Sequence, residues 1–168
     1  MLIRGFTIAI LTVCCSGAAL AYIVEGTKVQ QPKLLSFATE KLKNQGTIEQ
    51  NANGLTYVKL SEEYVAQLIK QINRPGFKIP NTAHICIIRE TESKNIKQLH
   101  ELGQTVHFKP LGFYTVVNHD VEYFMLAVDA PELSNIRLKY GLSKQLGNQA
   151  FSVVIGERQL SAENELES

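Results

Sequence analysis

A β-hairpin is predicted by the run Val106-His-Phe-Lys-Pro-Leu-Gly-Phe-Tyr-Thr-Val-Val117, Asn118-His-Asp120, Val121-Glu-Tyr-Phe-Met-Leu-Ala-Val128. Its two outer segments are rich in β-branched and aromatic residues, and the polar residues between them suit a tight turn. Shorter β-prone runs and segments with helical spacing flank the hairpin. The resulting order β-α-β-α-β-β-α-β predicts a single α+β domain with a mainly antiparallel sheet and helices packed on it.

The flanking elements follow from periodicity and capping residues. Strands are expected at residues 55–60, 83–88 and 151–155. Helices are expected at residues 62–73 with Ser61 as N-cap, at 93–102, and from the cap Asp129 to the stop Gly141. Because residues 83–88 and 151–155 are apolar at consecutive positions, as in strands covered on both faces, they should be neighbours near the middle of one sheet.

Length and charge narrow the class of protein. The chain has 168 residues, which suits one compact domain. Its 17 basic and 16 acidic residues leave a net charge of +1, so no extended nucleic-acid surface is expected. With 11 Gly, 5 Pro and 3 Cys, the composition excludes collagen-like, low-complexity and disulfide-rich proteins.

The N-terminal segment has the pattern of a secretory signal. Arg4 is followed by small or apolar residues up to Val24, and Ala19-Leu20-Ala21 fits a signal-peptidase site. Residues 1–21 are therefore expected to be a signal peptide of a periplasmic or secreted protein. The alternative is an uncleaved anchor over residues 5–24 that would hold the protein at the inner membrane, the one case in which a membrane would be a partner.

The remaining chain divides into three parts. Residues 22–53 are expected to be a linker with a possible short helix, residues 54–157 the folded domain, and residues 158–168 a disordered tail. Cleavage would remove Cys14 and Cys15 and leave Cys86 alone, which permits no intramolecular disulfide.

Common catalytic motifs are missing. The histidines have no H-x-x-x-H or H-E-x-x-H spacing, so no metal site is expected. The sequence also has no P-loop, no G-x-G-x-x-G after a strand and no G-x-S-x-G elbow. No cofactor is expected. What remains is a pair of strands, Ala83-His-Ile-Cys-Ile87 and Phe151-Ser-Val-Val-Ile-Gly156, in which alternate residues share a face.

The sequence of the closing third resembles the 2H phosphoesterase superfamily, and in particular its "Swiss army knife" RNA-repair-like branch. The matching text is Val128-Asp-Ala-Pro-Glu-Leu133, Arg137-Leu-Lys-Tyr-Gly-Leu142 and Phe151-Ser-Val-Val-Ile-Gly156, against a family pattern of VD-x-PEL, LR, GL and FH-x-T-IG. The run at 83–87 falls where the family has its first H-x-[ST]-x strand. The resemblance covers residues 54–157 and implies a 2H phosphoesterase-like fold.

The resemblance also implies a site. In the family two histidines act as general acid and base, and two hydroxyls hold the phosphate oxygens. His84 matches the first histidine and is the candidate catalytic residue, whereas Cys86 replaces the first hydroxyl. Ser152 stands in place of the second histidine and Val154 in place of the second hydroxyl. One of the four positions is retained, so weak or no phosphodiesterase activity on a cyclic phosphate or nucleotide is expected.

Simpler interpretations stay open for each residue. Without the resemblance, His84 would be a hydrogen-bonded core histidine and Cys86 a small buried hydrophobe. His107 is a weak candidate to replace the lost imidazole, while His100 and His119 are expected at the surface. Lys109 and Arg89 could line a phosphate site, but solvated surface is the safer assumption. The protein could therefore be a residual phosphodiesterase, a non-catalytic binding domain for a nucleotide or other phosphate-containing ligand, or an envelope interaction protein.

The expected cleavage after Ala21 can be tested directly at the N-terminus of the mature protein. The mature protein should begin at Tyr22, because the charge at Arg4, the apolar run and the small residues at 19 and 21 together form a cleavable signal. N-terminal sequencing of the exported protein measures this. Recovery of the chain with Met1 retained, in a membrane fraction, would support the anchor instead.

Overall fold

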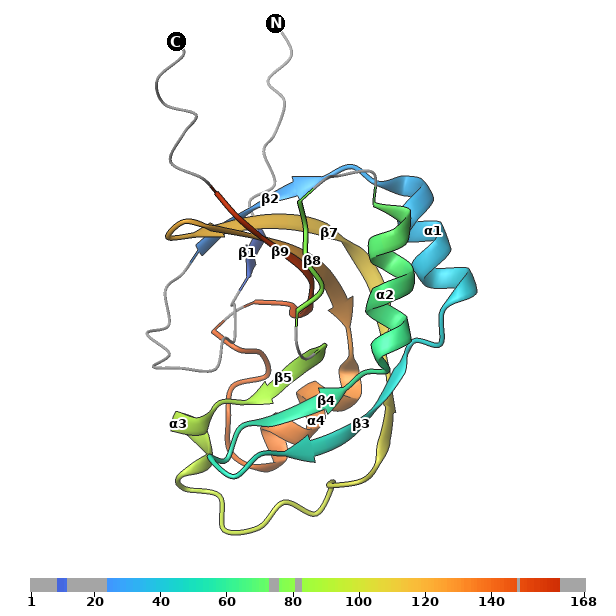
Figure 1. Ribbon diagram of the computed structural model, residues 1–168. Helices are drawn as coiled ribbons and strands as arrows, with labels where there is room; N and C mark the ends of the chain where they lie inside the picture. The colour runs from blue at the N-terminus through green and yellow to red at the C-terminus, as the bar shows by residue number, and fades with distance from the viewer. Residues whose placement is uncertain (1–8, 12–23, 73–75, 81–82, 148, 161–168) are drawn as a thin grey trace, which may run out of the picture.

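The computed structural model describes residues 9–11, 24–72, 76–80, 83–147 and 149–160, and places them in one α+β domain (Figure 1). The helices are α1 (Pro32–Lys41), α2 (Glu62–Gln71), α3 (Glu90–Ser93) and α4 (Pro131–Lys139). The strands are β1 (Ala9–Leu11), β2 (Val24–Val29), β3 (Gln45–Gln50), β4 (Thr56–Lys59), β5 (His84–Ile88), β6 (Thr105–His107), β7 (Lys109–Asn118), β8 (Val121–Asp129) and β9 (Phe151–Gln159).

Strands β2 to β9 form an antiparallel sheet, and β1 adds to its β2 edge, in the order β1-β2-β7-β8-β9-β5-β4-β3-β6. The predicted hairpin is confirmed as β7 and β8, which pair from Lys109↔Asp129 to Asn118↔Val121. At its turn, His119 has a φ of 53°, in the left-handed region that tight hairpin turns require.

The sheet bends strongly because one segment of chain belongs to both of its ends. Only Phe108 separates β6 from β7, yet β6 pairs with β3 while β7 pairs with β2 and β8. The β6 end of the strand order is therefore held close to β7, which lies near the other end. Figure 1 shows the result as an arch, with β7 running from the upper half of the molecule down past β3. A sheet bent in this way has an outer face and a concave inner face.

The two faces of the sheet carry two separate clusters of buried side chains. The outer face packs against α1, α2 and α4, and this main core includes Ile85, Leu126 and Val153, all with no exposed surface. A second, smaller cluster of Val116, Tyr123, Met125 and Ala127 lies on the concave face. Because side chains alternate between faces along a strand, the same strands supply both the core and the lining of the concavity.

The predicted neighbouring strands are confirmed. β5 and β9 are adjacent in the middle of the strand order and pair at Ile85↔Val153. The expected cap of the second helix is also confirmed, since the Tyr64 backbone N–H donates to Ser61 Oγ at 3.3 Å. α2 is two residues shorter than expected and ends at Gln71.

The expected linker at residues 22–53 is wrong for residues 24–50, which add β2, α1 and β3 to the domain. The possible helix is present as α1, whose Leu34 and Ala38 are buried in the core. Polar composition was misleading here because β2 and β3 lie near the ends of the sheet, where half of the side chains face solvent. Residues 1–8, 12–23 and 161–168, which hold most of the predicted signal and tail, lie outside the described residues, whereas residues 158 and 159 belong to β9.

The expected helix at 93–102 is also wrong. The structure has the single turn α3 at Glu90–Ser93, and the chain from Lys94 to Gln104 is irregular. The segment is held instead by Glu101, whose carboxylate accepts from Lys139 Nζ at 2.5 Å and from the Tyr140 hydroxyl at 2.6 Å. Asp129 ends β8 and the N-cap of α4 is Ala130, because Pro131 already sets the first helical turn.

A buried arginine joins the elements that carry the middle of the sheet. The Arg137 side chain has no exposed surface. Its guanidinium donates to both carboxylate oxygens of Glu92, at 2.7 and 3.0 Å, and to the backbone oxygen of Ile87 at 2.5 Å. Its Nε donates to the Ser143 backbone oxygen at 2.8 Å. α4 is thereby tied to α3 and to β5.

Replacement of Glu92 by glutamine should lower the free energy of unfolding by about 3 kcal/mol at pH 7, because it leaves the Arg137 charge buried without its counter-charge. Urea denaturation measures the change. Glu90→Gln is the matched control, since it removes the same charge from an exposed position of α3. An equal loss in both variants would contradict the role given to the buried pair.

The same pair should make stability depend on pH. Burial would raise the pKa of Glu92, but the hydrogen bonds from Arg137 and the Arg89 backbone, with the arginine charges, lower that pKa below its ordinary value of 4.5. An acid with a lowered pKa stabilises the fold above its ordinary pKa, and loses that contribution as the pH falls through the folded value. The difference in stability between the wild type and Glu92→Gln should therefore shrink between pH 5 and pH 3. A difference that stays constant over that range would contradict the assignment.

Candidate functional site

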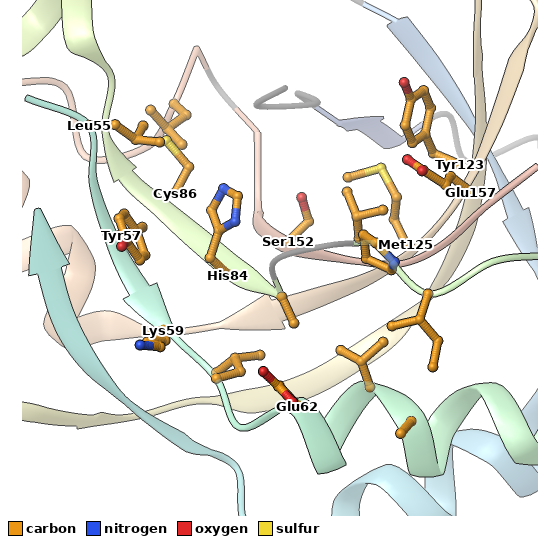
Figure 2. A pocket seen from close by; sticks show the side chains of 18 of the residues that line it. Leu55, Tyr57, Lys59, Glu62, His84, Cys86, Tyr123, Met125, Ser152 and Glu157 are labelled. Atoms are coloured by element: carbon orange, nitrogen blue, oxygen red, sulfur yellow. The ribbon is translucent and has the colours of Figure 1, made fainter. Parts of the chain in front are cut away.

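The concave face of the sheet encloses a cavity of about 940 Å³ (Figure 2). Its walls come from β4, β5, β8 and β9, and further lining residues come from α2 and from the segments before β5 and β9, namely Glu62, Val65, Ala66, Ile79, Pro80, Ala83, Leu146 and Ala150. The volume lies at the upper end of the range for small-molecule sites, which are mostly apolar with a few placed polar groups. The described lining fits that pattern, because twelve of its twenty residues are apolar.

All four motif-equivalent positions line this cavity. His84 and Cys86 come from β5, and Ser152 and Val154 from β9. Their placement follows from the Ile85↔Val153 pair, because both of those side chains point into the helix-covered core and their chain neighbours must point to the concave face. Figure 2 shows His84 and Ser152 projecting toward the same space from adjacent strands.

The surroundings of His84 are aromatic on one side. Its ring meets the edge of Tyr57, with centroids 5.3 Å apart and an interplanar angle of 63°. The Tyr57 hydroxyl donates to Glu49 Oε2 at 3.2 Å. Burial, and then the hydrogen bond to this carboxylate, raise the pKa of Tyr57 above its ordinary value. Tyr57 is therefore a neutral hydrogen-bond donor at neutral pH and no general base.

Among its described lining residues, the cavity has little positive charge to hold a phosphate. Its described lining has one lysine, Lys59, and two carboxylates, Glu62 and Glu157, which gives a formal charge of −1. Lys59 Nζ is also 3.4 Å from Glu49 Oε1, so its charge is partly offset outside the cavity. Phosphate sites in proteins are built from arginine, lysine or clustered backbone N–H groups.

The other predicted candidates lie away from the cavity. His107 is exposed on β6 and is not part of the lining, so the structure does not bring it to His84. His119 is exposed in the hairpin turn, as expected, and His100 is exposed in an irregular segment rather than on a helix. Lys109 and Arg89 do not line the cavity either.

Among the four motif-equivalent positions, acid–base chemistry is therefore limited to His84. His84 supplies an imidazole, the side chain that most often serves as a general acid or base. On the opposite strand Ser152 offers a hydroxyl that donates or accepts a hydrogen bond but does not titrate in that range, and Val154 offers neither. Cys86, only 5% exposed, supplies a weak donor in place of a hydroxyl.

Across the part of the chain that the structure describes, no group of three or more His, Cys, Asp or Glu side chains is placed to hold a metal ion. None of the helices in that part combines the length and the hydropathy needed to cross a membrane.

Sequence reasoning missed several lining residues that the alternation rule could have found. Tyr57 and Lys59 lie on the face of β4 opposite Cys86 and His84 in the register, and Tyr123 and Met125 alternate on β8. Glu157 could not be found this way, because a bulge in β9 changes the alternation before it. Comparison of the chain with protein-family models, with curated proteins and with solved structures gave no match.

Proposed function

We propose that this chain is an exported 2H phosphoesterase-like domain with a degraded active site. It binds a small molecule in the central cavity and hydrolyses cyclic phosphates or nucleotides slowly or not at all. One observation carries the proposal: the four motif-equivalent positions line a single cavity, and His84 is the one imidazole in its described lining.

The chemistry of in-line attack supports binding without turnover. Hydrolysis of a cyclic phosphate needs a base on one side of the phosphorus and an acid on the other. His84 fills one role, but Ser152, at the position of the second histidine, supplies no titrating group for the other. General acid–base groups are typically worth roughly 10²–10⁴-fold in rate each, so the loss of one imidazole removes most of the activity.

Two other functions have less support. A residual phosphodiesterase would use His84 with a water or with its own substrate as the second proton carrier. An envelope interaction protein that keeps only the fold would have no use for an internal space, and a cavity of about 940 Å³ argues against it.

The wild-type protein should turn over 2′,3′-cyclic nucleotides at least about 100-fold more slowly than the double variant Ser152→His, Val154→Thr, which restores the missing strand motif. Product formation over time measures both rates. His84→Ala in each background should abolish the activity gained. His107→Ala is the matched control, because it removes an exposed imidazole outside the cavity.

The wild-type rate and its dependence on His84 test the proposed loss of activity. Rapid wild-type turnover that requires His84 would contradict the degraded site, and turnover that ignores His84 would place the chemistry elsewhere. Circular dichroism establishes whether the double variant is folded. If the double variant does not fold, the wild-type rate alone tests the proposal.

A further inference from the structure

A β-bulge turns Glu157 toward the cavity. Across β8 and β9, Met125 pairs with Val154 and the next residue along, Phe124, pairs with Gly156, so β9 has one extra residue at this point. Val154 and Glu157 consequently both line the cavity, although they are three residues apart. With regular alternation, residue 156 would face the cavity and Glu157 the opposite side. Bulges near functional sites re-aim side chains in this way.

The backbone at the bulge is held tightly. A Cβ on Gly156 would come within 2.9 Å of Ile69 Cδ1 and 3.1 Å of Phe77 Cδ1, so α2 and the segment before β5 pack closely against it. The backbone of Glu157 also exchanges two hydrogen bonds with Lys78, at 2.8 and 3.0 Å. The backbone from which the Glu157 side chain extends is therefore held in place. Within the described structure, the Glu157 carboxylate has no ion-pair partner.

Tyr123 is the cross-strand neighbour of Glu157 on β8. Both line the same end of the cavity, and Figure 2 shows their side chains next to each other there. A carboxylate beside an aromatic ring attracts a positive charge, through direct charge attraction and through the negative face of the ring. An anionic ligand group would be repelled at this end.

The rest of the cavity wall changes character along β8 and β9. Next to the Tyr123 and Glu157 pair lie Met125 and Val154, which are apolar. Beyond them lies Ser152, opposite Ala127 on β8, and His84 projects from β5 into the same space (Figure 2). The cavity therefore presents an acidic and aromatic end, an apolar middle and a hydrogen-bonding end.

We infer that the cavity takes an amine with an apolar body, whose ammonium group lies at Glu157 and Tyr123 and whose hydrocarbon lies over Met125 and Val154. The inference rests on the proposed binding function and specifies its ligand class. It departs from the phosphate ligands that the sequence resemblance implies, because the described lining offers one lysine, already close to Glu49, against two carboxylates.

Three probes with the same hydrocarbon and different head groups test the inference. 1-Octylamine, 1-octanol and monooctyl phosphate are titrated into the full chain by isothermal titration calorimetry. The amine should bind about two- to five-fold more tightly than the alcohol, which is the range expected for a solvent-accessible charge pair, and the phosphate should bind most weakly. The preference of the amine over the alcohol should fall as salt is added.

Glu157→Gln should remove the preference for the amine and leave octanol binding unchanged. Glu63→Gln is the matched control, because it removes an exposed carboxylate that does not line the cavity. Glu62→Gln, at the cavity border, should have less effect than Glu157→Gln. Circular dichroism verifies that each variant is folded.

The outcomes test the ligand class and the binding function separately. Tightest binding of the phosphate, or an amine preference that survives Glu157→Gln or depends on Glu62 instead, would overturn the ligand assignment and leave the binding function standing. Failure of all three probes to bind would contradict the binding function, and this inference with it.

Discussion

Arg137 binds β5 close to the position where β5 and β9 stop pairing. β5 and β9 share only the register pair Ile85↔Val153, and β9 begins at Phe151, so the backbone oxygen of Ile87 lies at the edge of their contact. The Arg137 guanidinium binds that oxygen and the Glu92 carboxylate together. The Arg137 side chain thus provides a hydrogen bond to the buried backbone oxygen of Ile87, at the edge of the β5–β9 pairing. It thereby holds β5, the strand that carries His84, in place. A cavity between diverging strands requires such a tie, because few ladder hydrogen bonds hold the strands there.

The fold follows from the sequence where local pattern and tertiary environment agree. The hairpin, the helix after Ser61 and the central pairing of residues 83–88 with 151–155 were all predictable, because each has a clear periodicity or cap. β2 and β3 were not, because strands near the ends of a sheet are half solvated and read as polar linker. The irregular segment after α3 was misread as a helix, because its order comes from Glu101 contacting α4, a contact 38 residues away along the chain.

The candidate site was predictable in position and less so in character. The rule of alternation places His84, Cys86, Ser152 and Val154 on one face once β5 and β9 are neighbours, and the structure puts all four in one cavity. The balance of charge could not be predicted, because it depends on residues that reach the cavity from β4, α2 and a bulged part of β9. These contributions make the site apolar and slightly acidic, which is unsuited to a phosphate and compatible with binding of a different ligand.

The two motif strands meet at one residue pair, so that their alternate side chains face a common cavity. A methyl NOESY spectrum of selectively labelled protein tests this arrangement most directly. A cross-peak is expected between the methyl groups of Ile85 and Val153, alongside the Leu126–Val153 cross-peak that follows from the β8–β9 register. Absence of the Ile85–Val153 cross-peak while the Leu126–Val153 cross-peak remains would show that β9 is in place without β5 beside it, and would contradict the shared site.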